Sequence, residues 1–403
     1  RGLGDVYKRQ LDGAPSCVLA CGPQQKATIA LTREGTNGEA ACFVSQHIGD
    51  VENGGTFDAW NAARTRLEDL FDLAPAALAC DVHPSYLSGQ WAREQTRKCN
   101  LPLVEVQHHH AHIASVMAEA IAAGQLTTDA RVLGIAFDGT GAGTDGTIWG
   151  GEFLVASLGG FERTAHLRTW ALPGGAASVR DARRNAFALL SELGLLEHPG
   201  AARLLDSLDE QTRSVTATMI ERGINSPRTS SMGRLFDAAA AILGICDKAT
   251  YEGEPAIELE AAAWRALDNE IAHFPDDNAG YFASGPSWLD GPYVLDQKAL
   301  FEALLGGIEA GAPANRLALD FHVGIARSSA RIASDICVHE GIDTVALSGG
   351  VFMNRLLLQL LARELKSAGL TVLVPHTVPV NDGCIAYGQA AVASARLAQI
   401  ASQ

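Results

Sequence analysis

The chain has 403 residues and a formal net charge of -15 at pH 7, with 47% hydrophobic and 19% charged residues. This length predicts two or more lobes with a large buried core. The acidic balance argues against a protein that binds bulk nucleic acid or an anionic membrane, and no apolar run is long enough to span a bilayer.

The cysteine pattern and the first ten residues each support a separate expectation. Eight cysteines are scattered along the chain and form no C-x-x-C pair, which predicts neither a zinc ribbon nor a disulfide framework. We therefore expect a reducing, cytoplasmic location. Residues 1–10 lack Met and any periodicity, so we interpret them as a non-native or disordered remnant, and we expect the natural chain to begin upstream.

A first lobe is predicted over residues 11–125, from apolar, β-branched runs and from helical periodicity. Three strands come first, and a helix follows them. A strand, a helix, a strand and a final helix complete the lobe. The expected bounds before that final helix are Ser16–Ala20, Lys26–Thr32, Ala40–Ser45, Thr56–Phe71, Ala76–Cys80, Gly89–Lys98 and Leu103–Val106.

The final helix of this lobe opens with the run His108-His109-His110-Ala111-His112. On a helix, His108 and His112 lie on one face, one turn apart, a spacing that can hold one divalent metal. A polar helix start or a tag-like run is the alternative, but a tag would not lie between two patterned apolar segments. Two imidazoles do not complete a metal site, so we expect at least one more ligand elsewhere.

The same β-β-β-α-β-α-β-α order recurs over residues 126–403. A mainly helical insertion, at about residues 170–317, separates the third strand from the first helix of this second lobe. The expected bounds of the repeated elements are Arg131–Phe137, Ile148–Ser157, Phe161–Thr169, Ala318–His339, Thr344–Leu347, Arg355–Ala368, Thr371–Val374 and Ile385–Ala398. Those of the insertion helices are Ala182–Leu193, Thr212–Arg222, Arg234–Leu243 and Ala256–His273.

This repeat predicts an α/β protein with two duplicated ribonuclease-H-like lobes. Lobes of this order belong to the actin and hexokinase class, which holds a nucleotide in the cleft between its lobes. An ordinary dinucleotide-binding fold is the alternative, and it would not explain two opening runs of three strands.

Two glycine-rich segments are candidates for phosphate binding. In the first, Asp138 ends a strand and Gly139 and Gly141 follow, so bare N–H groups could face a phosphate while the carboxylate holds a metal. A plain turn explains this segment equally well. In the second, Gly349 and Gly350 join a short strand to a helix, whose positive end also suits a phosphate; a tight packing turn is the alternative.

Two further polar residues complete the candidate site. Asn354, one turn beyond the second glycine segment, could contact a base or a ribose. Asp382 opens the last helix; it could merely cap that helix, but its place at the cleft opposite the histidine helix makes it the third metal ligand. A metal that is bound by two imidazoles and one carboxylate, and that has open coordination positions, is typical of a catalytic site.

Five motifs, in order, resemble the HypF family of hydrogenase-maturation carbamoyltransferases from about residue 16 to the C-terminus. They are Ser45-Gln-His-Ile-Gly-Asp-Val-Glu52, Asp81-Val-His-Pro-Ser-Tyr-Leu-Ser88, Val106-Gln-His-His-His-Ala-His-Ile-Ala-Ser115, Phe137-Asp-Gly-Thr-Gly141 and Leu347-Ser-Gly-Gly-Val-Phe-Met-Asn354. The matched part corresponds to the C-terminal part of that family, which is similar to the universal tRNA threonylcarbamoyladenosine transferase.

The resemblance implies a metal and a nucleotide site. It implies that His108, His112 and Asp382 bind a divalent metal, iron or zinc, and that Asp138 is a catalytic residue beside it and a fourth ligand. The segments 232–237 and 251–258 resemble nucleoside-binding segments of the tRNA enzyme, which implies nucleoside contacts by Asp237 and Glu258. Glu254 stands where those segments have glycine.

Other positions depart from the family or lack a role. Ala176 replaces an acidic residue of a Leu-Pro-Gly-Gly-Asp segment. Arg180, with Arg183 and Arg184, forms the best basic cluster, which could meet an anion or lie on a helix surface. His47 and His83 lie within the motifs, but the sequence assigns neither a chemical step.

The implied reaction is carbamoyl transfer from a carbamoyl-adenylate, formed from ATP, to the C-terminal cysteine of the partner HypE, on the way to the cyanide ligand of [NiFe]-hydrogenase. The zinc-finger and adenylate-forming domains of the family are expected upstream of residue 1. An O-carbamoyltransferase acting on a small-molecule hydroxyl, a threonylcarbamoyl transferase acting on tRNA, and a non-enzymatic nucleotide-binding scaffold are the alternatives. The sequence does not predict the oligomeric state.

Overall fold

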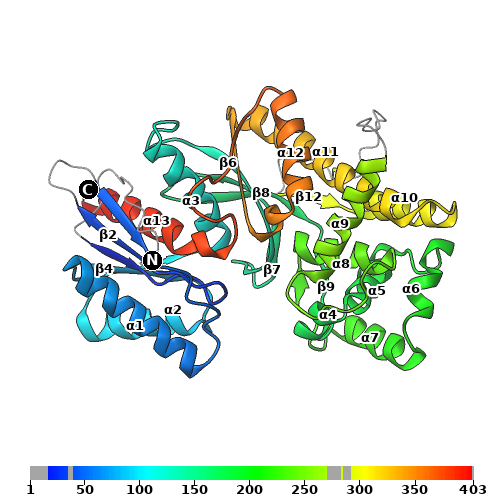
Figure 1. Cartoon of the computed structure of the whole chain (residues 1–403), viewed down its shortest axis with the longest axis horizontal. Helices are drawn as coiled ribbons and strands as arrows, with labels where there is room; N and C mark the ends of the chain where they lie inside the picture. Colours follow the sequence, from blue (N-terminus) through cyan, green and yellow to red (C-terminus); the bar gives the residue numbers. More distant parts are fainter. Residues whose placement is uncertain (1–16, 35–39, 270–282, 285–291, 402–403) are drawn as a thin grey trace.

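The computed structural model describes residues 17–34, 40–269, 283–284 and 292–401. The expected remnant at residues 1–10 and the end of the predicted helix beyond residue 269 lie outside these residues. Figure 1 shows an elongated molecule, with the first sheet at one end and a group of helices at the other.

The first sheet has five strands in the order β3-β2-β1-β4-β5. The first three strands pair antiparallel, and β4 and β5 then continue the sheet in parallel with β1. Their bounds are Val18–Ala20 (β1), Ala30–Glu34 (β2), Ala40–Val44 (β3), Ala77–Asp81 (β4) and Leu103–Val106 (β5). The helices α1 (Gly54–Phe71) and α2 (Leu87–Cys99) connect β3 to β4 and β4 to β5.

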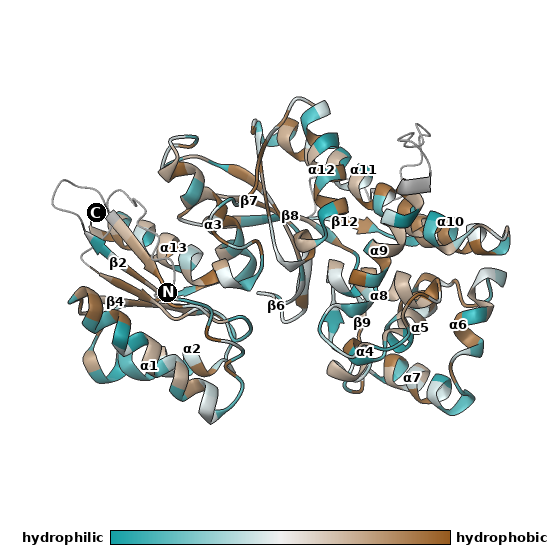
Figure 2. Cartoon of the chain, viewed as in Figure 1, coloured by the Kyte–Doolittle hydropathy of each residue, from teal (hydrophilic) through white to brown (hydrophobic). Residues whose placement is uncertain are grey.

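Successive side chains of β1 pack into different apolar clusters on the two faces of this sheet. Leu19 packs in one apolar cluster with Trp60 of α1, while Val18 and Ala20 pack in another cluster that includes Ile385. Because successive side chains of a strand point to opposite faces, one short strand serves both layers. Figure 2 shows hydrophilic residues along the outer helices α1 and α2 and hydrophobic residues on the strands.

The second sheet repeats the first one and extends it. The path β8-β7-β6-β13-β14 has the same order and the same strand directions as β3-β2-β1-β4-β5. These strands are Val132–Ala142 (β6), Ile148–Ala156 (β7), Phe161–Leu167 (β8), Thr344–Ser348 (β13) and Thr371–Leu373 (β14). The edge strands β12 (Tyr293–Asp296) and β11 (Ala283–Ser284) continue the sheet beyond β8.

The last helix of each half packs on the sheet of the other half. The histidine helix α3 (His108–Ala122) contacts β6, β7 and β13, whereas α13 (Ile385–Ala401) contacts β1, β2 and β4. The two helices also pack against each other, between the two sheets (Figure 1). This exchange places the start of α3 beside strand ends of the second sheet.

Seven α-helices, one short 3-10 helix and four short strands lie between β8 and the helix α11 (Ala314–Glu340) among the described residues, and two of these strands are the edge strands β11 and β12. The α-helices are α4 (Ala176–Arg180), α5 (Ala182–Leu193), α6 (Ala202–Asp206), α7 (Glu210–Arg222), α8 (Met232–Ile242), α9 (Glu254–Asn269) and α10 (Lys298–Glu309), and the other two strands are β9 (Trp170–Ala171) and β10 (Arg228–Thr229). The helices α4, α6 and α10 were not predicted from the sequence. In α10, the glycine pair Gly306–Gly307 lowers the intrinsic helix propensity of an otherwise amphipathic segment. The helix α12 (Arg355–Ser367) connects β13 to β14.

Within the described residues, none of the helices combines the length and the apolar character that crossing a membrane requires.

Candidate metal and nucleotide site

Four side chains from different elements converge between the two sheets. His108 and His112 come from the first turns of α3, Asp138 from β6, and Asp382 from the short 3-10 helix that precedes α13. The Nε2 atoms of the two histidines lie 3.3 and 3.4 Å from Oδ2 of Asp138. The same two atoms lie 3.7 and 3.6 Å from Oδ1 of Asp382. All four predicted ligands are therefore neighbours.

The start of α3 is held in place from both sides. Gln107 caps this helix, because its side-chain oxygen accepts a hydrogen bond from the backbone N–H of His110. On the β6 side, a Cβ atom on Gly141 would lie 2.5 Å from Cε1 of His109 and 3.0 Å from Cδ2 of His108. Glycine at position 141 thus lets the histidine helix lie directly against the strand. The expected contact of Gly141 with the cofactor stays a prediction.

Polar groups behind the two histidines orient their rings. Oδ2 of Asp81 accepts a hydrogen bond from Nδ1 of His108 at 2.9 Å. Nδ1 of His112 lies 3.2 Å from Oγ of Ser348 and 3.3 Å from Sγ of Cys384. With each Nδ1 atom engaged, the Nε2 atoms are the ones that face the two carboxylates. The roles of Asp81 and Ser348 were not predicted from the sequence, although both residues directly end buried strands.

The four atoms fit a divalent cation. Within the described residues, Nε2 of His108, Nε2 of His112 and Oδ2 of Asp138 are buried and have no hydrogen-bond partner. A buried polar atom without a partner is costly. The separations of 3.3 to 3.7 Å are close to the edge of a tetrahedron with bonds of about 2.1 Å, roughly 3.4 Å. Nitrogen and oxygen donors of this kind suit iron or zinc.

The charged groups of the cluster stabilise one another. Burial opposes the charged form of His108, yet Asp382 and the other facing carboxylates raise its pKa well above the ordinary value. Burial likewise opposes the charged form of Asp138, but the two facing imidazoles hold its pKa well below the ordinary value. Asp138 is buried and Asp382 is partly buried, so the pair requires positive charge beside it, which either the protonated imidazoles or a bound cation supplies.

A cavity of about 440 Å3 opens beside this cluster. Its polar wall includes Asp138 and Asp382, and its other walls come from α8, α9 and the segment that joins β13 to α12. The lining residues are Gln25, Lys26, Asp138, Gly139, Thr140, Gly233, Arg234, Phe236, Glu252, Gly253, Ala256, Ile257, Glu260, Gly350, Val351, Met353, Asn354, Asn381 and Asp382. This volume suits a nucleotide-sized ligand.

The glycine amides beside the cavity already have acceptors. Oδ1 of Asp138 accepts from the N–H groups of Gly139 at 2.8 Å and Gly350 at 3.1 Å. The N–H of Gly349 donates to the carbonyl of Val380. These bonds fix Asp138 with its Oδ2 atom toward the histidines. A phosphate contact by Gly139, Gly349 and Gly350 stays a prediction.

Two cationic side chains line the cavity, Arg234 and Lys26. Arg234 is 7% exposed, forms an ion pair of 3.0 Å with Asp237, and leaves its Nε atom without a partner within the described residues. A Cβ atom on Gly139 would lie 3.8 Å from its Nη2 atom. Arg234 therefore lies close to the predicted phosphate region and keeps its Nε donor without a partner within the described residues. It was not predicted from the sequence.

The predicted nucleoside residues have different surroundings. Asn354 lines the cavity; its side chain caps α12 and donates to Nε2 of His322 at 2.9 Å. Asp237 and Glu258 are not among the lining residues, although Asp237 holds Arg234 and Glu258 lies on α9 beside Ile257, which does line the cavity. Their nucleoside contacts stay predictions.

The residues without an assigned role are not among the four clustered side chains. The imidazole of His83 stacks on Tyr86, with ring centroids 4.1 Å apart. Arg180 is exposed, and Arg183 pairs with Asp181 at 2.7 Å. His47 lines a second cavity.

Comparisons with known proteins match most of the chain. Residues 134–389 match the family described as "Carbamoyltransferase, Kae1-like Domain, second subdomain", and residues 13–119 match the "HypF Kae1-like domain". The chain is 37% identical to carbamoyltransferase HypF2 of Cupriavidus necator, over 94% of this chain and 46% of that protein. It is 38% identical to a carbamoyltransferase HypF homolog of the same organism, over 95% of this chain and 92% of that protein.

A solved structure of full-length HypF in its phosphate- and nucleotide-bound form is similar to the chain, with a TM-score of 0.84 and 34% identity. The similarity covers 97% of this chain and 47% of that protein. The chain thus spans about half the length of HypF2 and of this solved structure, and nearly the whole length of the shorter homologue.

Proposed function

Because the chain belongs to the HypF carbamoyltransferase family, we propose that it transfers a carbamoyl group from carbamoyl-adenylate to the C-terminal cysteine of the partner HypE. This transfer would supply the cyanide ligand in [NiFe]-hydrogenase maturation. The observation that carries the proposal is the convergence of His108, His112, Asp138 and Asp382 beside a nucleotide-sized cavity.

The walls of the cavity suit the two ends of an acyl adenylate differently. Phe236, Ile257 and Val351 form an apolar region for the nucleoside. Arg234, whose Nε atom has no partner within the described residues, is the cation available to the phosphate, and charge-assisted bonds from a guanidinium suit its oxygens; Lys26 is paired with Glu252. The carbamoyl end then lies toward Asp138 and Asp382.

The bound cation would be held by the four clustered side chains and would supply Lewis-acid stabilisation to oxygen atoms of the substrate. In the transfer, the acceptor thiol loses its proton and its sulfur forms a bond to the carbonyl carbon. The bond from this carbon to the phosphate oxygen breaks, and AMP leaves with the electron pair. Asp81 and Ser348 keep the histidine rings oriented, so the site needs little reorganisation during the reaction.

The test uses the His108→Ala/His112→Ala double variant and the isosteric Asp382→Asn variant, with Asp58→Asn on the exposed surface of α1 as the matched control. Metal content is measured by mass spectrometry of the purified protein, and thiocarbamate formation on HypE is measured from supplied carbamoyl-adenylate. Circular dichroism verifies the fold of each variant.

We expect the two site variants to lose metal and transfer while the control keeps both. Undiminished transfer by a folded double variant would refute the metal site as the reaction centre. Transfer to a small-molecule hydroxyl or to tRNA, with none to HypE, would refute the proposed acceptor.

A further inference from the structure

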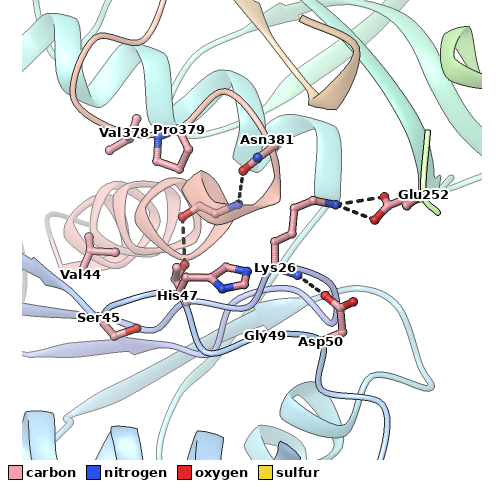
Figure 3. A pocket seen from close by; sticks show the side chains of 12 residues that line it. Lys26, Val44, Ser45, His47, Gly49, Asp50, Glu252, Val378, Pro379 and Asn381 are labelled. Atoms are coloured by element: carbon pink, nitrogen blue, oxygen red, sulfur yellow. Dashed lines mark hydrogen bonds and ion pairs between the residues drawn. The ribbon is translucent and has the colours of Figure 1, made fainter. Parts of the chain in front are cut away.

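A second cavity, of about 620 Å3, lies next to the first one. The end of β3 and the loop after it form one wall, with Val44, Ser45 and His47, and the segment before the last 3-10 helix forms the opposite wall (Figure 3). The lining residues are Lys26, Thr28, Val44, Ser45, His47, Gly49, Asp50, Glu252, Val378, Pro379, Asn381 and Gly383. The site described above uses few of them.

The two cavities meet at one ion pair. Lys26, Glu252 and Asn381 line both cavities, and Nζ of Lys26 lies 3.0 and 2.9 Å from the two carboxylate oxygens of Glu252. Lys26 has a left-handed backbone with φ of 47°, and its N–H donates to Asp50 at 2.8 Å, so the base of this side chain is fixed. The ion pair itself is solvated, with 29% and 56% of the two side chains exposed, and such a pair separates at little cost.

The lining of the second cavity does not suit a second nucleotide or another anion. Its lysine is already paired with Glu252, and the carboxylate of Asp50 lies on the same wall as His47 (Figure 3). Val44, Val378 and Pro379 add apolar surface next to the polar Ser45 and His47. A mixed lining of this kind suits a short stretch of polypeptide, which presents backbone polar groups and apolar side chains together.

The position of the cavity matches the approach that a nucleophile needs. In acyl transfer, the attacking sulfur must reach the carbonyl carbon from a side that the nucleotide leaves open. Asn381 directly precedes the candidate ligand Asp382 and lines both cavities. A chain end in the second cavity would therefore arrive at the metal cluster past the Lys26–Glu252 pair.

We propose that this second cavity binds the C-terminal segment of the acceptor polypeptide and guides its terminal thiol toward the metal cluster. The inference rests on the proposed function for the identity of the acceptor. It adds the place where that acceptor binds and the route by which it enters.

The experiment fills the cavity without touching the nucleotide site. His47 is exposed and lines only the second cavity, so His47→Trp adds bulk there and His47→Ala removes it. Val338→Trp places the same indole on the outer surface of α11, where the native side chain is 84% exposed, and is the matched control. The probe is a fluorescent synthetic peptide ending at the HypE C-terminal cysteine, and its binding is followed by anisotropy in the absence of carbamoyl-adenylate.

We expect His47→Trp to weaken peptide binding by about tenfold or more, while AMP binding stays unchanged and His47→Ala and Val338→Trp still bind the peptide. Undiminished peptide binding by His47→Trp would overturn the inference. If His47→Trp instead kept peptide binding and lost binding of inorganic phosphate, the second cavity would be an anion site, and this result would also overturn the inference. Since the assay contains no transfer step, its result is independent of whether carbamoyl transfer to HypE occurs.

Discussion

Nδ1 of His108 and Oδ2 of Asp81 are 2.9 Å apart, and both side chains are 1% exposed. The other carboxylate oxygen of Asp81 accepts from the backbone N–H of His83 at 2.9 Å. Asp81 therefore spans the end of β4 and the first turn of α3, and it fixes which nitrogen of His108 carries the proton.

Replacing Asp81 by Asn should weaken metal binding. If the Asn oxygen keeps the bond from the His83 N–H, its NH2 group faces Nδ1 of His108. The imidazole then shifts its proton to Nε2, the atom that faces the carboxylates. We expect metal affinity to fall by about 10- to 100-fold, measured by competition with a chelator. Equal affinities for the Asp81→Asn protein and the unsubstituted protein would contradict this role.

Gly388 marks the crossing of α13 with the histidine helix. A Cβ atom at this position would lie 1.8 Å from the backbone oxygen of Ala111. Backbone cannot turn away as a side chain can, so Gly388→Ala should force the two helices apart and lower the free energy of unfolding by about 3 kcal/mol or more. Thermal and urea denaturation measure this effect.

Gly306, in the middle of α10, provides the matched control, because a Cβ atom there meets nothing within 4 Å. Gly306→Ala should stabilise the chain by about 0.5–1 kcal/mol through the higher helix propensity of alanine. If both substitutions had the same small effect, the close crossing of α3 and α13 would not constrain the fold.

The element order and the repeated sheet could be predicted because their strands are apolar runs at regular places in the chain. The predicted fold class is confirmed. The exchange of α3 and α13 between the sheets could not be predicted. Every residue of α3 from His108 to Ala120 is buried, so this span has no solvent-exposed face whose polarity could indicate which sheet it covers.

The ligand candidates could be found because their residue types and spacing are informative by themselves. His108 and His112 have a helical ligand spacing, and Asp138 and Asp382 stand next to glycine. The prediction that Asp138 ends its strand is wrong, because β6 continues to Ala142 and Asp138 lies at an irregularity between Phe137 and Gly141. Partners such as Asp81 and Arg234 could not be found in this way. Their roles depend on contacts across the fold, as with Asp81 and His108, which are 27 positions apart.

His322 makes stability depend on pH. Burial lowers its pKa to about 4, and its neutral ring accepts from Asn354 at Nε2 and lies 2.7 Å from the Ala318 carbonyl at Nδ1. The unfolded chain, with a histidine pKa of about 6.5, binds a proton that the folded chain excludes. The contribution of His322 is thus fully present above that value and is lost as the pH falls toward 4.

Between about pH 7 and pH 5 this residue should account for a loss of about 2 kcal/mol in the free energy of unfolding. In His322→Gln, the amide oxygen can still accept from Asn354 but does not titrate in this range. Urea denaturation at both pH values should therefore show a smaller loss for the variant, by about this amount. Parallel pH profiles of the two proteins would show that His322 titrates normally in the fold.

Arg234 should distinguish nucleotides with a phosphate from those without one. Its guanidinium is almost fully buried, is paired with Asp237 on one side only, and lines the cavity near Gly139. If it binds the phosphate of the adenylate, Arg234→Met loses a hydrogen bond to a charged group. Such a bond contributes about 1.5–3 kcal/mol, so AMP affinity should fall by roughly 10- to 100-fold.

Adenosine supplies the control within the same protein, because it contacts the cavity without a phosphate. Isothermal titration should give the same adenosine affinity for Arg234→Met and for the unsubstituted chain, which also verifies that the cavity is intact. Arg234→Lys keeps the charge but not the planar fork of donors, so its AMP affinity should lie between the other two. An equal loss of AMP and adenosine binding would mean that Arg234 supports the wall of the cavity through Asp237 and does not bind the phosphate.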